Sequence, residues 1–366
     1  MFLYIHIPFC FKKCRYCSFV VYVAHQSQVN AYLECLSNEA LHYKNQKFKT
    51  VYIGGGTPTC LDKNQLEKLF VTIRKNFKFD SSVEFSVEAN PELLDKEKLL
   101  VMKKAGVNRV SLGVQSLNNK YLKYLGRNHD AKTARQSFEL LRKYGFKNIS
   151  LDLMYLFPTQ TFEELKQDLK EIVNLKSDHL SLYTLTIEKN SRFFVDKEKL
   201  PSEDIQAKYY LYVKEVLNQN GFKQYEISNF AKRGKESRHN LNYWQGGDYI
   251  GLGVAAHSHI NGKRYWNHSF LKNYMNAIKD KNMADEGVEI LDSYQRLKEA
   301  LTFGLRVNAG VDLKKLQDKY RAFFTAEDYL IINRLRKQGF LIQKKGFLKS
   351  TTKGQLVLDE LCGYLI

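Results

Sequence analysis

The 366 residues are enough for one large α/β domain plus a smaller one, so the chain can bury a sizeable core without crosslinks. Six cysteines, three of them within eight residues near the start, exclude a disulfide framework of the small secreted kind. The net charge of +18 comes mostly from Lys residues scattered among Glu and Asp, so charge alone does not choose between nucleic acid, a membrane surface and an anionic ligand.

The first predicted element is the strand in MFLYIHIPF, which is preceded by neither a basic leader nor a small-residue cleavage site. No later apolar run approaches the length of a membrane span, and we therefore expect a cytoplasmic protein.

Short apolar strands then alternate with amphipathic segments. The predicted strands are FLYIHI, TVYIGG, VEFSVEA, RVSLGVQ, ISLDLMYL and HLSLYTL, followed in turn by segments over 28–45, 62–76, 95–104, 118–143, 161–174 and 203–219. Successive βα units predict a parallel sheet with helices packed outside it. Six units are fewer than the eight of a complete barrel, which leaves a partial, open barrel and an open doubly wound sheet as alternatives.

Polar residues recur at every second position of these strands. In VEFSVEA, Glu and Ser alternate with Val and Phe, although parallel strands covered on both faces usually read as continuous apolar runs. The alternation puts Tyr4, Glu88, Gln115 and Asp152 on the polar face. It predicts an incompletely filled lumen that holds a ligand.

The βα rhythm stops near residue 220. The following segment is rich in Gly, Asn, His and aromatic residues, and the tail ends in INRLRKQGFLIQKKGFLKSTTKG, whose helix, hairpin and helix order resembles a winged helix. We predict a partial barrel over 1–220, a distinct segment over 221–285 and a smaller C-terminal α/β winged-helix-like domain over 286–366.

CFKKCRYC places Cys10, Cys14 and Cys17 in the loop after the first strand, at the end of a parallel sheet where active sites lie. Three thiolates are one short of a closed zinc site, which His6 or His25 would have to complete. A 4Fe-4S cluster fits better, because three thiolates leave one iron open for an exogenous ligand.

The second strand runs into the glycine loop of VYIGGGTPT, which comprises Gly54, Gly55, Gly56 and Thr57. Glycines let backbone groups approach a small ligand closely, although a tight turn before a helix would explain them as well. The loop lacks the Lys of a Walker loop and the spacing of a Rossmann fingerprint.

The motifs YIHIPFCFKKCRYCSF, GGGTPT, SVEANP, SLGVQS, LGRNH and DLMYLFP resemble, in order, those of radical S-adenosylmethionine (SAM) proteins related to oxygen-independent coproporphyrinogen III oxidase. The resemblance implies a partial (β/α)6 TIM-type barrel and a 4Fe-4S cluster whose open iron binds SAM. It also implies an electron donor such as a flavodoxin or ferredoxin, and the capacity to cleave SAM into methionine and a 5′-deoxyadenosyl radical. The positions that match the family's SAM contacts are Tyr4, Tyr16, Gly54, Gly55, Gly56, Thr57, Glu88, Gln115, Arg127 and Asp152.

Two departures point to one branch of these proteins. The motif typical of the oxidases is CxxxCxxCxC, whereas in this chain Phe19 occupies the position of the last cysteine. The oxidases also carry an N-terminal extension, whereas this chain begins three residues before Tyr4. RHNLNYW also contains the HNxxYW pattern typical of the HemW haem-chaperone branch. That resemblance implies a protein that binds haem and passes it to acceptor proteins, membrane-associated ones included, and a homodimer would be compatible with it.

Within this pattern, we predict that His239 ligates haem iron and that Tyr243 and Trp244 contact the porphyrin faces. Without the resemblance, a core histidine beside packed aromatics explains the motif as well. His257 and His259 are reserve candidates for haem or cofactor contact, although a structural role is the favoured interpretation of both. Four upstream basic residues are hypothesised to pair with the haem propionates: Lys232, Arg233, Lys235 and Arg238.

The second interpretation is an oxygen-independent coproporphyrinogen III oxidase, which would decarboxylate propionate side chains to give protoporphyrinogen IX. A winged-helix nucleic-acid binder is a distant third, because the second predicted helix of the tail is mixed instead of densely basic.

Overall fold

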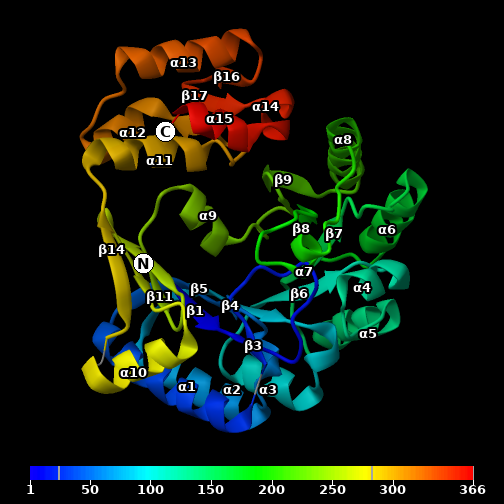
Figure 1. Ribbon diagram of the computed structural model, residues 1–366, viewed down its shortest axis with the longest axis vertical. Helices are drawn as coiled ribbons and strands as arrows, with labels where there is room; N and C mark the ends of the chain where they lie inside the picture. Colours follow the sequence, from blue (N-terminus) through cyan, green and yellow to red (C-terminus); the bar gives the residue numbers. More distant parts are fainter. Residues whose placement is uncertain (24, 282, 366) are drawn as a thin grey trace.

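The computed structural model describes residues 1–23, 25–281 and 283–365. Six parallel strands form the centre of its large sheet, in the order β1 (Phe2–Ile7), β4 (Lys47–Gly55), β5 (Lys78–Ala89), β6 (Arg109–Gln115), β7 (Ile149–Tyr155) and β8 (His179–Thr184). Helices cover the outer face of this curved sheet (Figure 1). The partial (β/α)6 barrel expected from the sequence is therefore confirmed.

The connecting helices lie close to their predicted positions. They are α1 (Gln26–Ala40), α2 (Lys63–Asn76), α3 (Lys96–Lys104), α4 (Asn119–Leu125), α5 (Ala131–Lys143), α6 (Phe162–Asn174), the short α7 (Arg192–Val195) and α8 (Glu203–Gln219). Short 3-10 turns follow at η1 (Leu41–Tyr43), η2 (Pro58–Cys60) and η3 (Pro91–Leu93). Capping boxes begin α2 at Asp62 and α6 at Thr161. In each, the side chain of the cap residue accepts the backbone N–H of the residue three positions later, whose side chain accepts the backbone N–H of the cap residue.

The segment over 118–143 is not one helix, as the sequence suggested, but two. Gly126 ends α4 with a left-handed φ of 75°, and Asp130 caps the start of α5 through the N–H of Thr133. The break places residues 126–130 at the carboxyl end of the sheet.

The apolar half of each strand packs against the helices. Leu3, Ile5 and Ile7 are at most 1% exposed and belong to the main hydrophobic core. Each such side chain contributes roughly 1.5–3 kcal/mol when it leaves water. Because successive strand residues point to opposite faces, the same burial directs Tyr4 and His6 into the lumen.

Segment 221–285 extends both edges of this sheet. Its elements are β9 (Lys223–Glu226), β10 (Asn229–Ala231), α9 (Arg238–Trp244), β11 (Tyr249–Leu252), β12 (His257–Ile260), β13 (Lys263–Asn267) and α10 (Leu271–Lys281), and β14 (Asp285–Ile290) follows. Among the described residues twelve strands form one sheet: β10 and β9 lie beyond β8, and β11 to β14 lie beyond β1. Strand β14 crosses the boundary predicted between residues 285 and 286. The division of the chain into the three predicted parts therefore stays a prediction.

The C-terminal part has its own core. It contains α11 (Ser293–Gly304), β15 (Val311–Asp312), α12 (Leu313–Tyr320), α13 (Ala326–Lys337), β16 (Leu341–Lys344), β17 (Phe347–Ser350), α14 (Thr352–Leu356) and α15 (Leu358–Leu365). The predicted helix, hairpin and helix order is present in α13, β16, β17 and α14. Figure 1 shows α9 between this part and the large sheet, and α9 contacts both β4 and α11. Of the helices in the described part of the chain, none is long and apolar enough to span a membrane.

Candidate cofactor and cargo sites

The three clustered cysteines lie on one loop at the carboxyl end of β1. The short strands β2 (Phe9–Cys10) and β3 (Tyr22–Val23) pair in parallel and close the base of this loop. Cys10, Cys14 and Cys17 are half-buried free thiols. Burial raises the pKa of Cys10 to about 11 and raises the pKa of Cys17 above its ordinary value, so both thiols keep their protons until a metal displaces them.

This donor set suits a cluster in which each thiolate binds its own iron. Within the described ranges, no group of three or more His, Cys, Asp or Glu side chains is gathered around the position of a single metal ion. His6, one of the two residues that could have completed a zinc site, instead hydrogen-bonds through Nδ1 to the Tyr4 hydroxyl at 2.9 Å.

The glycine loop fits between neighbours that leave no room for side chains. A Cβ on Gly54 would lie 2.8 Å from the carboxyl carbon of Glu88, and one on Gly55, whose φ is +113°, would lie 2.6 Å from the His6 ring. A Cβ on Gly56 would lie 2.7 Å from the backbone of the cysteine loop. The glycines are therefore required by close packing within the chain itself, in addition to any ligand.

Two buried carboxyl groups, those of Glu88 and Asp152, face the lumen. Glu88 accepts hydrogen bonds from the Tyr52 hydroxyl at 2.7 Å and from the Gly55 N–H at 3.2 Å. Burial, together with the charge of Asp152, raises the pKa of Glu88 to about 7. Asp152 accepts hydrogen bonds from Ser111, and burial raises its pKa as well. Neither carboxyl group forms an ion pair in the described part of the chain, so the lumen suits a cationic ligand such as the ammonium or sulfonium of SAM.

Arg127 connects the loops at this end of the sheet. Its Nη2 donates to Asn90 Oδ1 at 2.7 Å and to the Gly113 carbonyl at 3.0 Å, and its Nη1 lies 3.5 Å from the Cys14 sulfur. The Asn90 amide in turn donates to the Thr57 hydroxyl at 3.2 Å. Asn90 was not among the predicted site residues, although it stands within SVEANP. The buried Arg127 Nε has no partner among the described residues, which leaves a donor for a bound group.

The remaining predicted SAM residues are Tyr4, Tyr16 and Gln115. The Tyr4 ring stacks on Tyr52 at a centroid distance of 6.3 Å, and Tyr16 packs against the aromatic cluster around Phe157 and Phe193. Gln115 has a φ of 65° at an irregularity where β6 pairs with β7. A left-handed non-glycine residue costs about 1–3 kcal/mol, and residues strained in this way cluster at functional sites. The structure thus brings nine of the ten residues to the carboxyl end of the sheet, while Tyr4 lies in the middle of β1, where the Tyr52 ring separates it from His239. Their contact with SAM stays a prediction.

The HNxxYW motif forms α9 at the opposite, amino-terminal end of the lumen. Ser237 caps the helix, and the Glu84 carboxylate accepts the N–H groups of Arg238 at 3.1 Å and His239 at 3.0 Å. A carboxylate at a helix amino terminus is favoured by the exposed N–H groups and the helix dipole. The polar alternation of β5 includes Glu84, but the sequence did not show that it would hold this motif.

His239 is enclosed between the lumen and α9. Its Nδ1 is 2.7 Å from the Thr50 hydroxyl, and its Nε2 is 2.9 Å from the Tyr243 hydroxyl. The side chain is buried, and burial lowers its pKa to about 3, so the imidazole is neutral. Thr50 precedes Gly54 by four strand residues, which places His239 about 13 Å from the glycine loop. Ligation of haem iron by His239 stays a prediction, and it requires one of the two hydrogen bonds to break.

The other predicted haem contacts lie on the far side of α9. Trp244 faces the C-terminal part, where the Arg306 guanidinium lies 4.7 Å from its ring. His257 stacks on Trp266 at 5.8 Å. Three of the four upstream basic residues bind backbone carbonyls instead of facing a cavity: Lys232 binds the carbonyl of Lys176, Lys235 that of Lys147, and Arg238 that of Ser82. Their pairing with propionates therefore has no support from this geometry.

Comparison with known proteins identifies the family to which the chain belongs. A model of the radical SAM superfamily matches residues 4–172. The chain is 37% identical to a protein of Lactococcus lactis named heme chaperone HemW, over 96% of this chain and 93% of that protein. This chain belongs to the HemW family of radical SAM proteins. A Bacillus subtilis HemW is also 37% identical, over 98% of this chain and 97% of the relative.

Membership of the radical SAM superfamily implies a 4Fe-4S cluster and SAM, which the cysteine loop and the unpaired lumen carboxyl groups fit. Among solved structures, the coproporphyrinogen III oxidase HemN of Escherichia coli superimposes with a TM-score of 0.88 at 26% identity. The match covers 99% of this chain and 89% of HemN. The HemW family and HemN therefore share one fold, and the fold does not separate their functions.

Proposed function

We propose that this protein is a cytoplasmic haem chaperone that binds a 4Fe-4S cluster, SAM and one haem, and passes the haem to acceptor proteins. The observation that carries the proposal is the identity of 37% with relatives named heme chaperones over nearly their whole length. The fold of HemN supports a second candidate, an oxygen-independent coproporphyrinogen III oxidase. Phe19 argues against the oxidase, because it occupies the position of the fourth cysteine in the motif CxxxCxxCxC that is typical of the oxidases.

Cys10, Cys14 and Cys17 would hold the cluster, and the Arg127 guanidinium lies 3.5 Å from the Cys14 sulfur. When bound, the cluster supplies the electron that breaks the sulfonium C–S bond of SAM. Glu88 provides a buried acceptor for a cationic group, and Asn90 keeps Arg127 and Thr57 in fixed positions. An electron donor such as a flavodoxin or ferredoxin, membrane-associated acceptors and a homodimer belong to the same proposal.

The proposal is tested by titrating the anaerobically reconstituted full chain with haem and following its Soret absorption. We expect saturable binding of one haem per chain, and transfer of that haem when an apo-haemoprotein is added. Absence of saturable binding, with the cluster present, would refute the chaperone function.

A further inference from the structure

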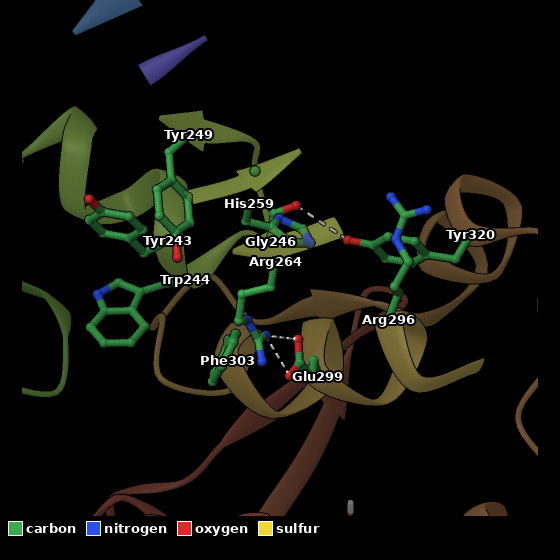
Figure 2. Close-up of a pocket in the computed structure, with 11 residues that line it drawn as sticks. Tyr243, Trp244, Gly246, Tyr249, His259, Arg264, Arg296, Glu299, Phe303 and Tyr320 are labelled. Atoms are coloured by element: carbon green, nitrogen blue, oxygen red, sulfur yellow. Dashed lines mark hydrogen bonds and ion pairs between the residues drawn. The ribbon is translucent and has the colours of Figure 1, made fainter. Parts of the chain in front are cut away.

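A second cavity lies on the side of α9 that faces away from the lumen. It has a volume of about 340 Å³ and is enclosed by α9, β11 to β13, α11 and α12. Figure 2 shows the aromatic rings that surround it: Tyr243, Trp244, Tyr249, Phe303 and Tyr320. Small-molecule sites are typically concave, lined by aromatic side chains and about 300–1,000 Å³ in volume. The cavity is therefore a candidate site for a flat, apolar ligand.

The cavity is also lined by the imidazole of His259. His259 Nδ1 faces the Asp248 carboxylate at 3.7 Å, and the side chain is 13% exposed. Its Nε2, at the other side of the ring, is buried and has no hydrogen-bond partner among the described residues. At 3.7 Å the carboxylate attracts the ring without a hydrogen bond, and a shift of the side chain is needed to expose Nε2 to a ligand in the cavity. His239, by contrast, uses both of its ring nitrogens in hydrogen bonds.

One cation at the cavity lacks an acidic partner. Arg264 is already bound to both carboxylate oxygens of Glu299 at 2.8 Å and to Glu289 at 2.9 Å. Arg296 lies with its guanidinium 5.1 Å from the Tyr320 ring, forms no ion pair among the described residues, and has a buried Nε without a partner. Figure 2 shows Arg296 extending from α11 and Arg264 reaching from β13 to Glu299 of α11. Arg296 is therefore available for a carboxylate of the ligand.

We propose that this cavity is the haem cargo site, in which His259 Nε2 binds the iron, Trp244 and Tyr249 contact the macrocycle, and Arg296 pairs with a propionate. The inference rests on the proposed haem-chaperone function and names the site that performs it. The cavity volume is small, so we expect it to enclose the iron and one edge of the macrocycle and to leave the other edge to an acceptor protein.

The placement separates the cargo from the radical chemistry. His239 and Tyr243 stand between the lumen and the cavity, and the glycine loop lies about 13 Å beyond His239 along β4. A haem held at His259 would thus be shielded from the SAM end of the lumen. A porphyrin substrate of the oxidase type would have to occupy the lumen itself.

The test compares haem binding by the reconstituted wild-type chain, His259→Ala and His257→Ala. His257, a reserve candidate on the same strand, is exposed, stacks on Trp266 and does not line the cavity, so it is the matched control. We expect His259→Ala to bind haem at least about tenfold more weakly, to lose the spectroscopic signature of an imidazole ligand, and to recover that signature with added imidazole. His257→Ala should match the wild type. Equal iron content and thermal unfolding would show that both variants are folded.

Arg296→Gln gives an independent readout. The wild type should prefer haem over its uncharged dimethyl ester, and Arg296→Gln should lose that preference, with haem affinity falling about tenfold. The proposed site would be overturned, with the chaperone function left intact, if His259→Ala bound haem as tightly as the wild type. The same would follow if the imidazole signature were lost only in His239→Gln. Failure of the wild type to bind haem would instead reject the function.

Discussion

The substitution Glu88→Gln tests two effects of the buried carboxyl group in the lumen: its cost to the stability of the ligand-free chain and its contribution to SAM binding. Glutamine has nearly the same size, and its amide oxygen can still accept the Tyr52 hydroxyl, so the substitution removes mainly the charge. In the wild type, burial and the Asp152 charge raise the Glu88 pKa from 4.5 to about 7. That rise corresponds to about 3 kcal/mol against the charged form in the ligand-free protein.

The sign of the pH dependence follows directly. Because the folded pKa lies above the unfolded one, the folded state holds the proton between 4.5 and about 7, and stability falls as the pH rises through that window. Glu88→Gln should therefore stabilise the ligand-free chain at about pH 8, by up to about 3 kcal/mol, and change it little at about pH 5. A charge-assisted bond to an ammonium contributes about 1.5–3 kcal/mol, so the same variant should bind SAM roughly 10- to 100-fold more weakly at the higher pH.

Urea unfolding of the ligand-free chain at the two pH values measures the first effect, and equilibrium dialysis of SAM against the reconstituted protein measures the second. Glu139→Gln, an exposed carboxylate on α5, is the control and should change neither quantity. The wild-type SAM affinity should also rise with pH up to about 7 and then level off. The reasoning would be refuted if Glu88→Gln destabilised the chain at the higher pH, or bound SAM as tightly as the control.

Three further predictions concern the two ends of the lumen. Gly55→Ala needs a left-handed alanine and displacement of the His6 ring, so we expect a loss of at least about 1–3 kcal/mol in urea unfolding; an unchanged midpoint would contradict the packing described. Glu84→Ala removes the carboxylate that accepts the N–H groups of Arg238 and His239, and should lower the free energy of unfolding by about 1–3 kcal/mol, with a smaller loss for Glu84→Gln. Equal stability of the wild type and both variants would exclude this cap. Cys14→Ala should lower the iron content after anaerobic reconstitution to near background, while Cys35→Ala, in α1, should keep it; retention of full iron by the first would disprove the cluster loop.

Much of the barrel could be predicted because its signals are local. Each βα unit reads as a short apolar strand and an amphipathic helix, and all six were found. The polar alternation also identified Tyr4, Glu88 and Asp152 as lumen residues, since the period of two is a property of the strand itself. The break between α4 and α5 was missed, although Gly126 and Asp130 carried the signals for a helix end and a helix start.

The relations between distant segments could not be predicted in the same way. The parallel pairing of β11 with β1 joins segments at opposite ends of the barrel sequence, and only the folded chain shows it. The same pairing carries α9 to the amino-terminal end of the lumen and opens a cavity against α11. Hence the sequence ranked His239 first by its motif and kept His259 as a reserve, and only the hydrogen-bond partners show that His239 uses both ring nitrogens while His259 Nε2 has no partner among the described residues.

The most direct test of the account is a comparison of two activities in one anaerobically reconstituted preparation that contains SAM and a one-electron reductant. The preparation is divided between a haem titration and an assay of carbon dioxide released from coproporphyrinogen III. The account predicts saturable binding of one haem per chain and no decarboxylation above the level of the cluster-free Cys14→Ala chain. Enzyme-like decarboxylation without saturable haem binding would contradict it and identify an oxidase.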